Sequence, residues 1–235
     1  MSLKVVSFSL WGTYARYTIG AIKNAELVNK YYPGFVSWFY IHKESVPDNI
    51  VKSLEAIPNV KIIFKTGNIM TCKPMMWRFE AIDDPEVAIV MPRDTDTRIL
   101  MREVDAVNIW LESGKTFHIM RDHPDHVEHI LGGMFGTRKI PSIPQWGLLM
   151  EKVNQNNKIY NYDQAFLRDY IYPAIKNDAI IHASFNKRND EACLEFPSKY
   201  IDYHHVGEYV YPDESRNGPS VNEIKNKCPP HLIAT

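Results

Sequence analysis

The sequence predicts an α/β protein with a Rossmann-like, mostly parallel central sheet flanked by helices. Apolar runs of strand length alternate with amphipathic stretches through the first 65 residues, and this β-α-β-α-β order is typical of a parallel sheet. A chain of 235 residues can form one large domain or two small ones, and 45% hydrophobic residues suffice for a core. Since neither a linker nor an internal repeat divides the chain, we expect a single domain.

In the first half of the chain, two of the expected helices end near a proline or glycine. A strand at 3–10 leads to a helix at 17–30, in which Ala21, Ile22, Ala25 and Val28 share one side. Pro33 and Gly34 break this helix. The following elements alternate in the same way: a strand at 35–41, a helix at 48–56, a strand at 60–64, a helix at 74–80 and a strand at 87–91.

The second half continues with mixed elements and ends in a polar tail. An amphipathic helix at 103–113 closes at Gly114, as helices often do. We then expect strands at 116–120, 131–136 and 178–183, and helices at 144–154 and 162–172. Beyond Pro212 the chain is polar and rich in glycine and proline, so we expect residues 212–235 to cover the surface or to be partly disordered.

Two carboxylates, Asp94 and Asp96, follow the apolar strand at 87–91. Ligands of α/β sheets collect at the carboxyl ends of strands, and paired carboxylates suit Mg²⁺ or Mn²⁺, which often bridges to substrate phosphates. Arg93 and Arg98 flank the pair, and we expect them to hold the local charge near zero. Asp-x-Asp also occurs by chance in solvated turns.

Other polar residues have both a structural and a functional interpretation. Arg78 between Trp77 and Phe79 suits a phosphate or a surface ion pair, and Asp163 suits a helix cap or a site. Residues 121–129 hold three histidines and could form a metal site, an acid–base pair or a hydrated loop. Their spacing matches no standard metal motif, so we expect a loop near the substrate. The glycines of 131–136 indicate backbone passing close to another group, or a β-bulge.

Composition and known motifs exclude several classes of protein. The net charge of −1 gives no reason to expect a nucleic-acid surface. The loop after the first strand has one glycine, Gly12, and neither a dinucleotide fingerprint nor a P-loop. No apolar run has the length of a membrane span, and we see no signal-peptide pattern. Three widely spaced cysteines favour reduced thiols, so we expect a cytoplasmic protein, located at a membrane surface only if its acceptor is lipid-linked.

Taken together, six segments resemble one family, the GT-A glycosyltransferases, which use nucleotide-sugars and have a single α/β domain. More narrowly, the chain resembles small capsular or capsid-glycan transferases of bacteria and large DNA viruses. The resemblance covers most of residues 3–211. The segments are 76–79, 93–98, 110–115, 118–124, 130–136 and 163–164.

The resemblance implies a role for particular residues. Asp94 and Asp96 match the metal-binding Asp-x-Asp, Asp94 facing the ribose and Asp96 the Mn²⁺ or Mg²⁺ ion. His204, three residues before Gly207, matches a late metal-binding histidine, with His205 as its rival. The residues implied for the nucleotide-sugar are Leu10, Gly12, Arg16, Arg78, Asp94, Gly132, Gly133 and Gln164. Asp122 and Asp163 are the catalytic candidates.

The same resemblance divides the chain into a nucleotide-binding half at about 1–98, a sugar and acceptor half at about 99–211, and the surface tail. It implies transfer of a sugar, from a UDP-sugar by preference, to a glycan or another hydroxyl acceptor. Two alternatives stay open. A sugar-nucleotide nucleotidyltransferase would release pyrophosphate, although the loop at Gly12 lacks the usual glycine-rich basic pattern. A non-catalytic carbohydrate-binding protein would tolerate the loss of both Asp94 and Asp96.

Overall fold

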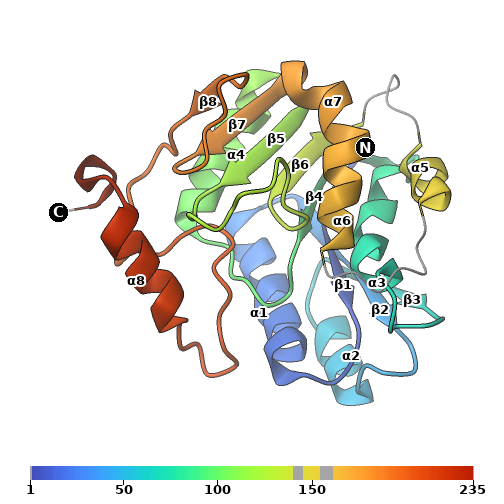
Figure 1. The fold of residues 1–235 in the computed structure, drawn as a ribbon. Coiled ribbons are helices and arrows are strands. Elements are labelled where there is room, and N and C mark those ends of the chain that lie inside the picture. Colours follow the sequence, from blue (N-terminus) through green and yellow to red (C-terminus); the bar gives the residue numbers. More distant parts are fainter. Residues whose placement is uncertain (1, 140–144, 154–160, 235) are drawn as a thin grey trace.

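The computed structural model describes residues 2–139, 145–153 and 161–234. In the described chain, an eight-stranded sheet has the order β3-β2-β1-β4-β6-β5-β7-β8 (Figure 1). Its strands are β1 (Leu3–Leu10), β2 (Phe35–His42), β3 (Val60–Lys65), β4 (Val87–Arg93), β5 (Phe117–Arg121), β6 (Phe135–Arg138), β7 (Ala179–Ala183) and β8 (Cys193–Leu194). Among the strands of the described residues, only β6 is antiparallel to its neighbours, β4 and β5. The predicted α/β architecture with a mostly parallel sheet is therefore confirmed.

Helices cover both faces of the sheet (Figure 1). The helical elements are α1 (Ala15–Tyr31), α2 (Asp48–Glu55), α3 (Lys73–Met76), η1 (Trp77–Ile82), α4 (Met101–Ser113), α5 (Trp146–Lys152), α6 (Tyr162–Phe166), η2 (Leu167–Ile171), α7 (Tyr172–Ile175), η3 (Lys176–Asp178), α8 (Gly218–Lys227) and η4 (Pro230–Leu232). Side chains of α1, α2 and α4 pack on one face, and those of η1, α5, α6 and α7 pack on the other.

Strand β1 shows how the sequence produces these two cores. Successive side chains of a strand point to opposite faces. Val6, Phe8 and Leu10 accordingly join the core under α1, whereas Val5 joins the core under η1. All four side chains are at most 1% exposed, because β1 lies between β2 and β4 inside the sheet.

Three elements differ from their sequence predictions. The strand predicted at 131–136 begins only at Phe135, since residues 132–133 form a turn. The helical run from Tyr162 continues beyond Pro173, because the π-helical turn η2 places this proline in the first turn of α7, where its missing N–H costs little. The tail contains the helix α8, whose Ile224 packs with Tyr200 and Leu232. The predicted helix at 144–154 lies partly outside the described residues.

Within the described residues, no helix has the length and apolar character needed to cross a membrane.

Candidate functional site

The strand directions bring several polar segments to one edge of the sheet. Strands β1, β4 and β5 run in the same sense, so the residues that follow Leu10, Arg93 and Arg121 lie at the same edge. Because β6 runs in the opposite sense, the glycine segment before Phe135 enters the sheet from this edge too. Ligands of open α/β sheets bind at this edge.

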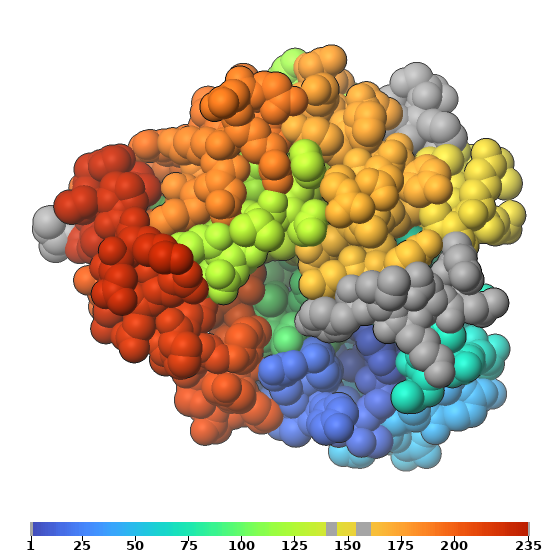
Figure 2. All heavy atoms as spheres, in the orientation of Figure 1, coloured from blue at the N-terminus to red at the C-terminus, as the bar shows by residue number. Residues whose placement is uncertain are grey.

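A cavity of about 560 Å³ opens at this edge. Figure 2 shows it as the hollow in the centre of the visible face, between the N-terminal part of the chain and the parts that follow residue 120. Its volume is that of a typical small-molecule site. The predicted site residues that line it are Leu10, Gly12, Arg78, Asp94, Asp96, Gly132, Asp163 and Gln164.

Arg78 joins two of the cavity carboxylates. Its guanidinium donates from Nη2 to Asp163 Oδ2 at 2.8 Å and from Nη1 to Asp94 Oδ1. The backbone N–H of Arg78 donates to Ser9 Oγ at 2.9 Å, which ties η1 to the end of β1. Arg78 is only 6% exposed, so it is a buried bridge between two acidic segments and not a surface arginine.

The two glycines before β6 allow the backbone to approach this bridge. A Cβ at Gly132 would overlap Asp163 Oδ2 and the Arg78 guanidinium, and a Cβ at Gly133 would overlap Asp94 Oδ2. The predicted close approach is therefore confirmed. Gly133 does not line the cavity itself but packs against the carboxylate that does.

Helix α1 fixes the acidic loop through residues that the sequence analysis missed. The Asn24 amide donates to the carbonyl oxygens of Thr95 at 3.2 Å and Thr97 at 2.8 Å. At Gly20 a Cβ would overlap the Thr95 carbonyl oxygen. The signal was present, because Asn24 is a polar residue on the apolar side of the helix, between Ala21 and Ala25.

The flanking arginines do not neutralise the acidic pair, contrary to the sequence prediction. Arg93 Nε donates to Glu103 Oε1 at 2.7 Å, and Arg98 Nη2 donates to Glu214 Oε1 at 2.8 Å. Arg93 belongs to β4 and points into the protein, where both members of its ion pair are 3% exposed. The charges that face the aspartates come from Arg78 and Arg16.

Arg16 lies beside Asp96 and not in the cavity lining. Its Nε is 3.4 Å from Asp96 Oδ2, and its guanidinium stacks over the rings of Tyr17 and Tyr209. Burial and the neighbouring Asp94 charge raise the pKa of Asp96 to about 6. Arg16 therefore offsets the charge of Asp96 only in part.

Asp163 lies in the first turn of α6, where Asn161 is the residue that precedes the helix. Burial raises the pKa of the Asp163 carboxyl, while the Arg78 charge opposes this effect. A carboxylate with a raised pKa that faces a cavity suits a role in proton transfer. Gln164 lines the same wall, and its backbone N–H donates to Asp163 Oδ1 at 2.9 Å.

Asp122, the other catalytic candidate, lies outside the cavity lining and is fully buried. Its carboxylate accepts two hydrogen bonds from Arg102, both at 2.8 Å, and one from the Tyr200 hydroxyl at 2.6 Å. The Ser184 hydroxyl and the backbone N–H of Val206 also donate to it. These contacts join β5 and α4 to the C-terminal segment, which is a structural role.

The structure does not bring His204 or His205 to the acidic pair. His204 Nδ1 lies 3.1 Å from Glu208 Oε2, and its ring lines a separate cleft with Arg98 and Arg216. His205 is 3% exposed and packs on the His123 ring, with the ring centroids 4.6 Å apart. From this segment, Gly207 and Tyr209 line the cavity instead.

His126 is the histidine that lines the cavity, and no sequence signal distinguished it from its neighbours. Its Nδ1 accepts a hydrogen bond from the Asp122 backbone N–H at 3.0 Å. The neutral ring therefore carries its proton on Nε2. Burial and the neighbouring His123 lower the pKa of His126 to about 3.

The acidic pair fits a hard divalent cation by its chemistry. Asp94 and Asp96 line one cavity, and the charge of Asp94 raises the pKa of Asp96, a repulsion that a cation between them would relieve. Carboxylate oxygens are the ligands that Mg²⁺ and Mn²⁺ prefer. Although His126 lines the same cavity, no histidine of the described residues forms a group with these two carboxylates in which all the ligand atoms lie within 4.8 Å of one another. Further ligands would therefore come from the substrate phosphates or from water.

No protein-family model matches the chain, and no curated protein matches it in sequence. Among solved structures, the chain is similar to 4-diphosphocytidyl-2C-methyl-D-erythritol synthase from Anaerococcus prevotii. The TM-score is 0.47 at 11% identity, over 77% of this chain and 87% of that chain. It is also similar to a glycosyltransferase involved in the glycosylation of the major capsid of PBCV-1. That TM-score is 0.43 at 15% identity, over 78% of this chain and 82% of the other.

Proposed function

We propose that this protein is a metal-dependent glycosyltransferase that moves a sugar from a nucleotide-sugar, a UDP-sugar by preference, to a hydroxyl group of a glycan or related acceptor. One observation carries the proposal: Asp94, Asp96, Asp163 and Arg78 meet in a cavity at the carboxyl edge of the sheet. This combination supplies a cation site, a cationic side chain and a carboxylate with a raised pKa in one space.

Asp94 and Asp96 would hold Mg²⁺ or Mn²⁺, and such an ion would neutralise the negative charge on a departing diphosphate. Arg78 would add its own charge toward the same group. Because Arg78 is fixed by Asp94, Asp163 and the Ser9 hydroxyl, it needs little rearrangement to do so. The loop that contains Gly12 would receive the nucleobase. This loop is held by the bond from Gly12 N–H to Ser45 Oγ, at 2.8 Å.

Asp163 would take the proton of the acceptor hydroxyl in an inverting transfer. Its raised pKa brings its basicity closer to neutral pH. Burial of Asp122 under Arg102, Tyr200 and Val206 favours Asp163 over Asp122 for this role. His126 and Gln164 would flank the sugar as hydrogen-bond partners, since both line the cavity.

The first test is calorimetric titration with UDP, and then with GDP, in the presence and absence of Mn²⁺. We expect UDP to bind tightly only with the metal, and we expect Asp96→Asn to lose that dependence. Asp178→Asn is a matched control, because Asp178 is an exposed aspartate at the opposite edge of the sheet, next to the start of β7.

A donor screen against UDP-sugars follows, with the product as its readout. Release of UDP supports the glycosyltransferase proposal, whereas release of pyrophosphate from a sugar phosphate and a nucleoside triphosphate supports a nucleotidyltransferase. If no nucleotide binds with any divalent ion, both transferase proposals are wrong.

A further inference from the structure

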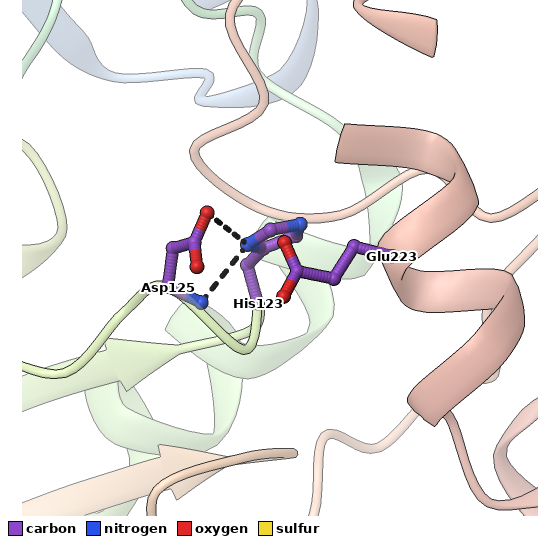
Figure 3. A group of neighbouring side chains, drawn as sticks. All are labelled: His123, Asp125 and Glu223. Atoms are coloured by element: carbon purple, nitrogen blue, oxygen red, sulfur yellow. Dashed lines mark hydrogen bonds and ion pairs between the residues drawn. The ribbon is translucent and has the colours of Figure 1, made fainter. Parts of the chain in front are cut away.

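A second group of metal-ligand side chains lies outside the cavity lining and connects α8 to the loop after β5. His123 and Asp125 belong to this loop, and Glu223 belongs to α8 (Figure 3). One ligand atom from each of the three residues lies within 4.8 Å of the other two. We call these three residues the His123 cluster. We propose that the His123 cluster is a divalent cation site, suited to Zn²⁺, that fastens helix α8 to the body of the protein.

The orientation of His123 supports the proposal. Its Nε2 lies 3.2 Å from the backbone carbonyl oxygen of Ser220 and 3.1 Å from the Ser220 hydroxyl, and it donates to these oxygens when the proton is on Nε2. Its Nδ1 accepts from the Asp125 backbone N–H at 3.1 Å and therefore has no proton. Metal-binding histidines are usually fixed in this way, with one nitrogen donating to a carbonyl and the other presenting its lone pair.

The Nδ1 atom of His123 has carboxylate groups near it as well as the N–H group of Asp125. Asp125 Oδ2 lies 3.7 Å from His123 Nδ1, and Figure 3 shows Glu223 reaching from α8 toward the same ring. Two carboxylates beside this nitrogen attract a cation, and the hydrogen bond from the Asp125 N–H is the contact that a bound ion would replace. His123 itself is 3% exposed, so its ring cannot turn away into solvent.

The described structure already provides one cation, Lys227, which forms an ion pair with Glu223 one helical turn earlier. Its side chain is 57% exposed, so this pair is worth little and the ammonium group is free to leave. A metal ion at His123 Nδ1 would displace Lys227 and the hydrogen bond from the Asp125 backbone N–H. Tetrahedral zinc ligands lie about 3.3 Å apart, which exposed Asp125 and half-buried Glu223 can reach by small side-chain rotations.

The ligand set favours zinc over magnesium. Imidazole is a good ligand for Zn²⁺, whereas Mg²⁺ prefers oxygen ligands and octahedral geometry. Three protein ligands and a water molecule would complete a tetrahedral shell. The site would stabilise the loop that carries Asp122 and His126, so its effect would be on the fold around the cavity and not on the reaction.

The experiment is a calorimetric titration with Zn²⁺ of a variant that carries Asp94→Asn and Asp96→Asn, in which the acidic pair of the cavity is removed. We expect one zinc ion per chain and a raised melting temperature. Adding Glu223→Gln should weaken binding at least about tenfold and abolish the rise in melting temperature. Glu26→Gln is the matched control, since it also removes a helix glutamate from an ion pair with a lysine, Lys23.

Lys227→Met separates a metal site from an ordinary ion pair. A cation site should gain zinc affinity, by up to about fivefold, when the competing ammonium group is removed. A cluster that serves only as an ion pair would lose stability without any gain in affinity. The proposal is overturned if the Asp94→Asn, Asp96→Asn variant binds no zinc, or if Glu223→Gln binds zinc as tightly as its parent.

Discussion

At the scale of single residues, the candidate site depends on one buried arginine that two carboxylates share. Arg78 contacts Asp94 through one nitrogen and, through the other, Asp163, which lies 85 positions later in the chain. Each of the three residues was a separate candidate from the sequence: Asp94 because it follows a strand, Asp163 because it opens a helix, and Arg78 because a guanidinium suits a phosphate. The sequence could not pair them, since nothing in the local pattern says that α6 lies across the cavity from β4.

The contrast between Asp122 and Asp163 leads to a prediction. We expect Asp122→Asn to lower the free energy of unfolding by roughly 3 kcal/mol, because Arg102 would be left buried without its partner charge. Asp163→Asn should cost less stability but should abolish sugar transfer while UDP binding persists. Urea unfolding and a transfer assay measure the two effects. A stable Asp122→Asn protein without activity would reverse the assignment.

The glycines before β6 provide a second prediction. Gly132→Ala should displace the Arg78–Asp163 pair and should lower UDP–Mn²⁺ affinity at least about tenfold, since interiors tolerate overlap poorly. Gly218→Ala is its control, because a Cβ there would meet no atom within 4 Å. Calorimetry and circular dichroism of both variants suffice. Equal affinities in the two variants would mean that the close approach at Gly132 is unimportant.

At the scale of elements, periodicity predicted most strands and helices within one or two residues, because each carries its own apolar pattern. Periodicity failed where contacts with distant parts of the chain determine the local backbone conformation. The glycine segment at 131–134 is a turn that packs on the acidic bridge, and the π-helical turn η2 lets the helix pass Pro173. Helix α8 was missed because its hydrophobic residues are few, and Ile224 alone is buried.

Helix α1 and the acidic loop form a unit that can be tested. Asn24→Ala removes the amide that binds the carbonyl oxygens of Thr95 and Thr97, so we expect a loss of about 1–3 kcal/mol and weaker metal-dependent UDP binding. Asn29→Ala is the control on the same helix, since the Asn29 amide donates to Pro58 at an exposed site. Thermal unfolding and calorimetry compare them. If Asn29→Ala impairs UDP binding equally, the effect belongs to the helix as a whole.

At the scale of the whole molecule, the C-terminal segment closes one side of the site. Val210 N–H donates to the Asp96 carbonyl oxygen at 2.8 Å, and Tyr200 donates to Asp122. The family resemblance implied His204 or His205 from this segment as a metal ligand. The segment does reach the acidic loop, as the resemblance implied, but Gly207 and Tyr209 are the residues that line the cavity.

The same packing buries histidines that should make the fold sensitive to acid. Burial lowers the pKa values of His126 and His205 to about 3 and that of His182 to about 4. Below pH 6.5 these histidines bind protons in the unfolded chain but stay neutral in the folded chain. The free energy of unfolding therefore falls as the pH falls. Each such histidine contributes about 1.4 kcal/mol per pH unit.

His205→Phe keeps an aromatic ring in the core and removes one proton acceptor. Between pH 6.5 and 5 we therefore expect its free energy of unfolding to fall less steeply than that of the natural protein. The difference in slope corresponds to nearly one fewer proton taken up on unfolding. The raised pKa of Asp96 has the opposite effect, because protonation of this carboxyl makes the folded state more stable as the pH falls. Both proteins contain Asp96, so its contribution cancels when their slopes are compared. Urea unfolding at several pH values measures the slopes, with exposed His231→Gln as the control. Identical slopes for His205→Phe and the natural protein would show that His205 becomes protonated within the fold.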